Sequence, residues 1–170
     1  MLERESTPGD THQLRAERAP LRVVVRRAPV SDSAGMLVRV ETRIPSDIGT
    51  IEEAVELIVR HCLSGTVVTQ RLRFNLCVAL SESLANAIIC GNLEDPLKWV
   101  DVRAELRPET IVVHVTDEGD GFDPASVRDP TTPEELEEPC GRGLFLIRSL
   151  VDEVRFNPKG NSICLTLRRK

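Results

Sequence analysis

Hydrophobic and polar positions recur along the chain with two different periods, which predict two kinds of element. Apolar residues spaced by three or four predict amphipathic helices over 51–63 and 69–90. Alternation in twos predicts strands over 36–44, 98–106 and 111–116. The last two strands are separated by a turn signal, so we expect them to form an antiparallel hairpin.

The C-terminal part continues this pattern with a short helix and a second hairpin. Residues 144–151 have a helical pattern, and 153–157 and 162–168 are strand-like on either side of a polar turn. The order of elements predicts an α+β two-layer sandwich. In this fold class a mixed, mostly antiparallel sheet is covered on one face by about three helices.

Local signals predict where two of these helices begin or end. Thr50 is followed three residues later by Glu53, which matches a capping box, and Ser46 is an alternative cap. Gly91 and Asn92 follow the last apolar position of the second helix, as is typical of a helix C-terminus.

Two segments lack a regular pattern. Residues 1–35 are mostly polar around one short run of valines, so we expect a flexible N-terminal extension, with a weak strand at 21–26 as the alternative. Residues 123–139 contain six acidic residues, one arginine and four prolines, which predicts a flexible, solvated loop. The folded domain is then expected to span 36–170.

Composition narrows the class of protein. A chain of 170 residues with 41% hydrophobic and 29% charged residues is typical of a soluble globular domain. We find no apolar stretch near the roughly 20 residues that span a bilayer, and residues 1–20 lack the apolar core of a signal peptide. A net charge of −5 and 3% aromatic residues argue against nucleic-acid binding. The five cysteines form no CxxC pair, so we expect free thiols in a reducing cytoplasm.

Three short blocks carry the candidate chemistry, and the first is a pair of polar residues in an apolar helix. Glu82 and Asn86 are four residues apart and so share one helix face. A carboxylate in such a helix needs a cationic or polar partner, which Mg²⁺ with a triphosphate would provide. Asparagine then supplies an oxygen ligand and glutamate a general base. The alternative is an ordinary polar helix edge.

The second block, Asp117-Glu-Gly119-Asp-Gly121, comes directly after a predicted strand. An aspartate there can accept a hydrogen bond from the amino group of adenine, and the glycines keep the wall of the pocket thin. The alternative is a plain hairpin exit in which glycine supplies a positive φ.

The third block, Gly141-Arg142-Gly143, precedes an apolar segment that begins with Leu144 and Phe145. It predicts a helix start whose backbone amides can bind phosphate, with a structural helix start as the alternative. Neither a Rossmann fingerprint nor a Walker motif is present in the sequence.

Together, and in this order, the blocks resemble the GHKL ATPases, which include gyrase, heat-shock chaperone, histidine kinase and mismatch-repair proteins. Within them the chain is most similar to the bacterial anti-sigma factor serine-protein kinases. Residues 82–92 are similar to the N box, 117–124 to the first glycine box and 141–154 to the second. The resemblance covers 36–170.

This resemblance implies a Bergerat-type site for ATP and Mg²⁺, built by the N box and the first glycine box. Asn86 would hold Mg²⁺, and Glu82 would be the catalytic base that activates a serine of a partner protein. Asp117 would recognise adenine, with Gly119 and Gly121 shaping the wall beside the base.

The second glycine box would wrap the phosphates, and 123–139 would be the ATP lid. Its ATP-binding residues would be Gly141, Arg142, Gly143, Leu144 and Phe145. The family further implies a cytoplasmic homodimer that binds a sigma factor and phosphorylates a STAS-domain anti-anti-sigma protein, without direct contact with nucleic acid or membrane.

The sequence departs from the family pattern in three places. The lid is acidic at 137–138, where some members carry a basic residue, Cys90 stands where histidine is common, and the final turn contains Lys159-Gly-Asn161. A second hypothesis therefore stays open: an ATP-sensing partner-switch module with little or no kinase activity.

Overall fold

The computed structural model describes residues 21, 23–27, 37–124 and 139–169. Each helix and strand predicted from the periodicity is present. The elements, in chain order, are β1 (Val23–Arg27), β2 (Val38–Pro45), the 3-10 turn η1 (Ile48–Thr50), α1 (Ile51–Cys62), α2 (Gln70–Asn86), the π-helix η2 (Ala87–Gly91), β3 (Trp99–Leu106), β4 (Thr110–Asp117), α3 (Pro139–Leu150), β5 (Glu153–Phe156) and β6 (Ser162–Arg168).

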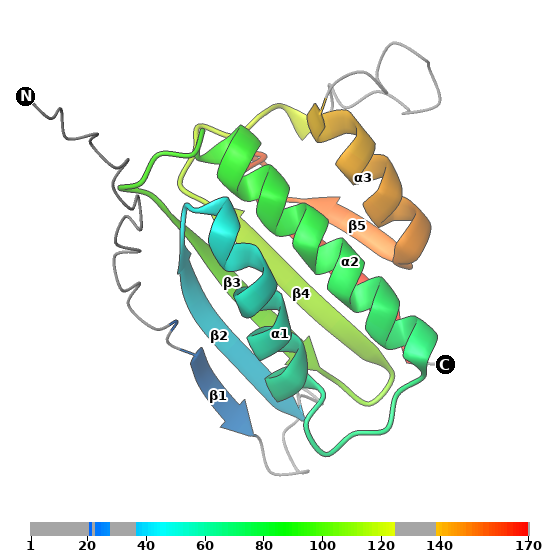
Figure 1. Cartoon of the computed structure of the whole chain (residues 1–170). Helices are drawn as coiled ribbons and strands as arrows, with labels where there is room; N and C mark the ends of the chain where they lie inside the picture. Colours follow the sequence, from blue (N-terminus) through cyan, green and yellow to red (C-terminus); the bar gives the residue numbers. More distant parts are fainter. Residues whose placement is uncertain (1–20, 22, 28–36, 125–138, 170) are drawn as a thin grey trace, which may run out of the picture.

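The strands form one six-stranded sheet in the order β1-β2-β3-β4-β6-β5. The three helices α1, α2 and α3 cover one face of this sheet, with α2 in the middle (Figure 1). This confirms the predicted α+β two-layer sandwich. All five strand pairs among the described residues are antiparallel, so the sheet is more regular than the mixed sheet we expected.

β1 lies inside the segment predicted to be a flexible extension. It pairs with β2, with Val25 opposite Val40, and Val25 packs against the core. The weak strand alternative is therefore the one that forms here, because successive valines favour extended structure. Apart from β1 and Leu21, residues 1–35 lie outside the described part of the chain, and the domain boundary at 36 stays a prediction.

The hydrophobic core fills the space between the sheet and the helices. Its largest fully buried side chains include Ile44, Ile58, Leu76, Leu80, Leu84, Ile88, Ile111, Ile147, Leu165 and Leu167. Four of them belong to α2 and η2, at the spacing of four predicted from the sequence. The central helix is thus held from its inner side, which fixes the direction of its polar side chains.

The helical stretch Gln70–Gly91 is, by length and composition, one that could cross a membrane. From the sequence we expected no apolar stretch of that length, and this expectation was wrong. Because the leucines of this stretch are buried in the core, packing against the sheet accounts for its apolar composition.

α1 begins differently from the prediction. The side chain of Thr50 caps no helix amide but donates to the Asp47 carbonyl oxygen at 2.6 Å. Asp47 caps η1 instead, accepting from the Gly49 amide at 2.8 Å. The capping box with Glu53 is absent because η1 leaves Thr50 in a helical conformation, whereas a capping residue needs an extended one.

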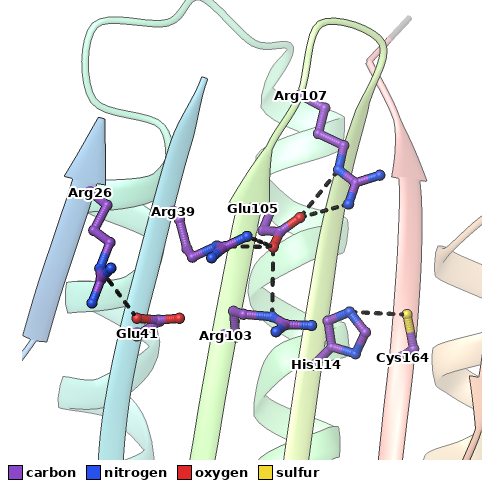
Figure 2. A network of polar contacts seen from close by, with 8 residues as sticks. All are labelled: Arg26, Arg39, Glu41, Arg103, Glu105, Arg107, His114 and Cys164. Atoms are coloured by element: carbon purple, nitrogen blue, oxygen red, sulfur yellow. Dashed lines mark hydrogen bonds and ion pairs between the residues drawn. The ribbon is translucent and has the colours of Figure 1, made fainter. Parts of the chain in front are cut away.

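The sheet face without helices carries a network of charged residues around Glu105 (Figure 2). This residue belongs to the polar side of β3, as predicted, yet its side chain is only 5% exposed. Arg39 and Arg107 contact its carboxylate at 2.9 and 2.7 Å, and Arg103 lies 3.6 Å away. Burial alone would raise the pKa of Glu105, but the Arg107 hydrogen bond and the charges of the three arginines outweigh it and lower the pKa.

The cysteines correct one expectation. Cys62, Cys77 and Cys164 are free, as predicted, and burial raises the pKa of the Cys62 thiol to about 12. Cys90 is disulfide-bonded, so the prediction of free thiols throughout was wrong at this position. The spacing of cysteines along the sequence does not show which of them folding brings close enough to form a disulfide.

Candidate functional site

The C-terminal half of α2 presents Glu82 and Asn86 on one face, toward α3. Gly143 of α3 lies directly against both: a Cβ atom there would be 2.9 Å from Glu82 Oε2 and 3.2 Å from the carboxamide of Asn86. A larger residue would displace these side chains, so glycine is what permits the close approach of the two helices. The structure thereby brings together three of the residues predicted to form the site.

Neither polar side chain of this pair is neutralised by the fold. Within the described residues, the carboxylate of Glu82 and the carboxamide of Asn86 have no hydrogen-bond or ion-pair partner. Both residues are half-buried. Partly desolvated polar groups that lack internal partners are typical of sites that bind a polar ligand.

The end of η2 packs on the second predicted block. The carboxylate of Asp117, at the end of β4, lies against Gly91: a Cβ atom on this glycine would be 2.4 Å from Asp117 Cγ. A Cβ atom on Gly119 would be 2.1 Å from the Gly91 carbonyl oxygen. Gly91 therefore leaves room for the Asp117 side chain, and Gly119 is required by its contact with the Gly91 backbone.

The carboxylate of Asp117 is held in a fixed orientation. Its Oδ1 atom accepts a hydrogen bond from the Gly119 amide at 2.8 Å. Burial raises the pKa of Asp117, and this effect is larger than the opposing effects of the backbone hydrogen bonds, Lys159 and Lys98. A half-buried carboxylate with free acceptor capacity can recognise a hydrogen-bond donor in a ligand.

The turn between β5 and β6 holds the loop after β4, residues 117–121, from the other side. The backbone amide of Asp117 donates to the Asn161 carbonyl at 3.0 Å, and Asn161 Nδ2 donates to the Asp117 carbonyl at 2.8 Å. Lys159 Nζ donates to the Gly119 carbonyl at 2.8 Å. Gly121 has φ +78°, and a Cβ atom there would be 2.0 Å from the Lys159 carbonyl oxygen. The loop is therefore rigidly held.

Sequence reasoning noted Lys159 and Asn161 only as a departure from a family pattern and did not assign them to the site. The signal that identifies them is the pairing of β4 with β6, which sets Thr116 opposite Ser162. Because this pairing is antiparallel, the residue after Thr116 lies opposite the residue before Ser162, so Asp117 and Asn161 come together at the same end of the sheet.

α3 begins at Pro139, two residues before Gly141, so the predicted helix start at 144 was too late. Proline suits the first turn of a helix, and glycine is tolerated there where a neighbour must approach closely. Gly141 and Gly143 thus belong to the first turns of α3. Residues 125–138 of the predicted lid lie outside the described part of the chain.

The remaining predicted residues of α3 differ in their exposure. Arg142 is exposed, Leu144 is half-buried, and Phe145 is 47% exposed. Arg142 lies in sequence between Gly141, near the start of α3, and Gly143, which contacts α2. Among the described residues, no hydrogen bond or ion pair joins these three side chains to Glu82, Asn86 or Asp117.

The donor set at Asn86 fits Mg²⁺ that is shared with phosphate. Among the described residues, no group of three or more histidine, cysteine, aspartate or glutamate side chains could hold a metal ion. Mg²⁺ is commonly held by one or two protein oxygens together with water and substrate phosphates. The Asn86 oxygen beside the start of α3 matches that mode, and not that of a metal site built from protein alone.

Comparison with known proteins supports the same interpretation. Residues 44–167 match the family described as the histidine kinase-like ATPase domain. The chain is 34% identical over 123 residues to the serine-protein kinase RsbW of Bacillus subtilis, covering 64% of this chain and 75% of that protein. It is 30% identical over 112 residues to the serine-protein kinase RsbW of Oceanobacillus iheyensis, covering 59% of this chain and 70% of that protein.

Proposed function

We propose that this chain, which belongs to the histidine kinase-like ATPase family and within it to the RsbW serine-protein kinases, transfers phosphate from ATP to a serine of a STAS-domain anti-anti-sigma partner. It would also bind and inhibit a sigma factor. One observation carries the proposal: Glu82 and Asn86 lie together against Gly143 with no internal partner among the described residues.

Asp117 would recognise the nucleotide base. Its carboxylate accepts a hydrogen bond from the adenine amino group, while Gly119 and Gly121 leave room for the ring. The loop is supported by Lys159 and Asn161, which hold its backbone carbonyls through hydrogen bonds of 2.8 Å. Preorganisation of this kind reduces the cost of ordering the loop when a ligand binds.

Asn86 would supply a protein oxygen to Mg²⁺, which neutralises charge on the phosphates. The amides of the first turn of α3, which contains Gly141, would bind phosphate oxygens, because the first N–H groups of a helix lack partners within it. Gly143, one turn further, would keep the helix surface open beside Asn86. Arg142, Leu144 and Phe145 complete the ATP-binding block, and Arg142 adds positive charge beside the phosphates.

Glu82 would act as the general base. The serine oxygen of the partner attacks the γ-phosphorus, the bond from this phosphorus to ADP breaks, and the serine proton passes to the Glu82 carboxylate. No described arginine or lysine forms an ion pair with this carboxylate, so its oxygens remain available as acceptors for the serine hydroxyl.

The biological setting forms part of the proposal. We propose a cytoplasmic homodimer that acts on protein partners, not on nucleic acid or a membrane. Its ATP-binding domain would be 36–170, with 1–35 as an extension. The acidic residues at 137–138 favour the second hypothesis, an ATP-sensing partner-switch module with little turnover.

Calorimetry with Mg·ATP tests the binding site. Asp117→Asn should weaken ATP binding by about 1–3 kcal/mol, the range for losing a hydrogen bond to a charged buried group. Asp120→Asn is the matched control, because this exposed aspartate lies in the same loop and should leave affinity unchanged. Wild-type protein that does not bind Mg·ATP at millimolar concentration would refute the proposal.

Incubation with labelled ATP and a STAS-domain protein separates the two hypotheses. A kinase transfers label to a serine of that protein. A binding module binds ATP with the same preference for adenine and transfers no label. Either result leaves the assignment of the nucleotide pocket standing.

A further inference from the structure

Asn92 is completely buried where the N-box helix ends, with an exposed fraction of 0%. The nitrogen and the oxygen of its carboxamide each have a partner in another part of the fold. Asn92 Nδ2 donates to the Trp99 carbonyl at 2.9 Å, and Asn92 Oδ1 accepts from the Glu118 amide at 2.9 Å. One side chain therefore joins the end of η2 to the start of β3 and to the loop after β4.

The bond to Glu118 acts on the adenine side of the site. Glu118 is the residue between Asp117 and Gly119, and its amide belongs to the peptide unit that leaves Asp117. Gly91, the residue before Asn92, lies against the Asp117 carboxylate. The position of Asp117 is thus determined by Gly91 through contact and by Asn92 through a hydrogen bond.

The backbone beside Asn92 adopts an unfavourable conformation. Leu93 and Glu94 have φ of +57° and +54°, in the left-handed region that is sterically unfavourable for a non-glycine residue. The Asn92 amide donates to the Ala87 carbonyl and the Glu94 amide to the Ile88 carbonyl, both at 2.8 Å. Strain of this kind persists only where surrounding contacts fix the backbone, and it is concentrated at functional sites.

We propose that Asn92 is a positioning residue that holds the adenine-recognition loop at a fixed distance from the N-box helix. It sets the preference for adenine over other bases by acting through Asp117, and it contacts no nucleotide itself. This inference rests on the proposed ATP-binding function. Since the phosphates would be held by Asn86 and by α3, loss of Asn92 affects recognition of the base and spares recognition of the phosphates.

The test compares affinities for Mg·ATP, Mg·GTP and magnesium tripolyphosphate by calorimetry. Asn92→Ala should reduce the ratio of ATP affinity to GTP affinity by about tenfold or more, as loss of one buried hydrogen bond at the base allows. Affinity for tripolyphosphate should stay within about twofold of the wild-type value. This corresponds to a change of about 0.4 kcal/mol or less in binding free energy, as expected at a site that Asn92 does not touch.

Two variants separate positioning from a general structural role. Asn92→Asp keeps the acceptor for the Glu118 amide but buries a carboxylate against the Trp99 carbonyl oxygen, so it should retain most of the preference for ATP while lowering the thermal unfolding temperature. Asn75→Ala removes a comparable bond, from Asn75 Nδ2 to the Leu150 carbonyl at 2.9 Å, and should leave the preference unchanged. Should Asn92→Ala fail to fold, Asn92→Ser carries the same expectation with a smaller cavity.

The outcomes are distinguishable. A wild-type protein that binds ATP no better than GTP refutes the proposed function. A wild-type protein that prefers ATP, together with an Asn92→Ala variant that keeps this preference, overturns the role of Asn92 alone. Equal losses for ATP, GTP and tripolyphosphate also overturn it, because they indicate general destabilisation.

Discussion

Two glutamates on opposite sides of the molecule show two ways in which this fold treats a carboxylate. Glu105, on the sheet face without helices, is contacted by Arg39, Arg103 and Arg107. Glu82, on the helix layer, has no ion-pair partner among the described residues and lies against Gly143. The first glutamate is neutralised by its own fold, whereas the second is left available for other groups.

This difference separates a structural charge from a functional one. Burying a carboxylate is costly unless cationic groups and hydrogen bonds compensate, and the arginines around Glu105 do so. Glu82 avoids the full cost because it is only half-buried, and its reactivity is preserved because nothing in the described fold competes for it. Replacing Glu105 by its neutral isostere should therefore affect stability and spare activity, whereas replacing Glu82 should affect activity and spare stability.

The largest expected effect is on catalysis at Glu82. Glu82→Gln should reduce phosphate transfer to the STAS partner by about 10²–10⁴-fold, the contribution typical of a general base. Affinity for Mg·ATP and the thermal unfolding temperature should change little, because the side chain has no hydrogen-bond or ion-pair partner among the described residues to lose. Single-turnover transfer of labelled phosphate and calorimetry check these expectations.

Asn86→Ala is the matched comparison for this prediction. It removes the proposed oxygen ligand of Mg²⁺ and should lower both ATP affinity and transfer, whereas Glu82→Gln should lower transfer alone. If the two variants lose ATP affinity to the same extent, the division of roles between metal ligand and base is wrong.

The second prediction concerns stability at Glu105. Glu105→Gln should lower the free energy of unfolding by about 1–3 kcal/mol, because three neighbouring arginines lose their shared counter-charge. The arginines are 32–45% exposed, so solvent screening keeps the loss below that of a fully buried pair. Denaturant unfolding measures the change, and ATP affinity should be unaffected.

Glu41→Gln provides the control on the same face. Its pair with Arg26 is long, at 3.7 Å, and its partner is 67% exposed. Such surface pairs contribute about 0–1 kcal/mol, so the variant should be nearly as stable as wild type. A loss as large as that of Glu105→Gln would mean that net charge, and not the buried network, stabilises this face.

The fold was largely predictable because burial is encoded in the spacing of apolar side chains. The leucines of α2 recur every four residues, and alternate residues of β3 face the core, so both elements follow from the sequence alone. The sequence was less informative where a local signal opposes the structure. Proline and glycine at the start of α3 were interpreted as loop residues, and the valines of β1 are surrounded by polar residues.

The candidate site was predictable only in part. Glu82, Asn86 and Asp117 stand out because each side chain type suits a particular chemistry at its position. Asn92 and Asn161 do not, because their effect depends on hydrogen bonds to Glu118 and Asp117, which are 26 and 44 residues away. No local pattern encodes contacts of that range, since they arise from strand pairing and from the packing of η2 on β4.

The smallest expected effects are those of acidic pH. As pH falls, the contributions of Asp117 and Glu105 to folding stability should change in opposite directions. The pKa of Asp117 is raised above its ordinary value of 3.8, chiefly by burial, so this carboxylate gains a proton earlier than an exposed one as pH falls. ATP affinity should therefore decline as pH falls through the raised pKa. The contribution of Asp117 to folding stability has the opposite sense: it is present below pH 3.8 and lost as pH rises through the raised pKa.

For Glu105 the pKa is lowered from an ordinary value of 4.5, since the arginines outweigh the effect of burial. Its contribution to stability is complete above pH 4.5 and is lost as pH falls through the lowered pKa. Glu105→Gln should therefore flatten the acid side of the stability profile and leave the affinity profile as in wild type, whereas Asp117→Asn should flatten the affinity profile. Calorimetry and denaturant unfolding of both variants from pH 3 to 7 measure the two profiles. Identical profiles in the two variants would show that a general acid response of the fold, and not these two carboxylates, governs both properties.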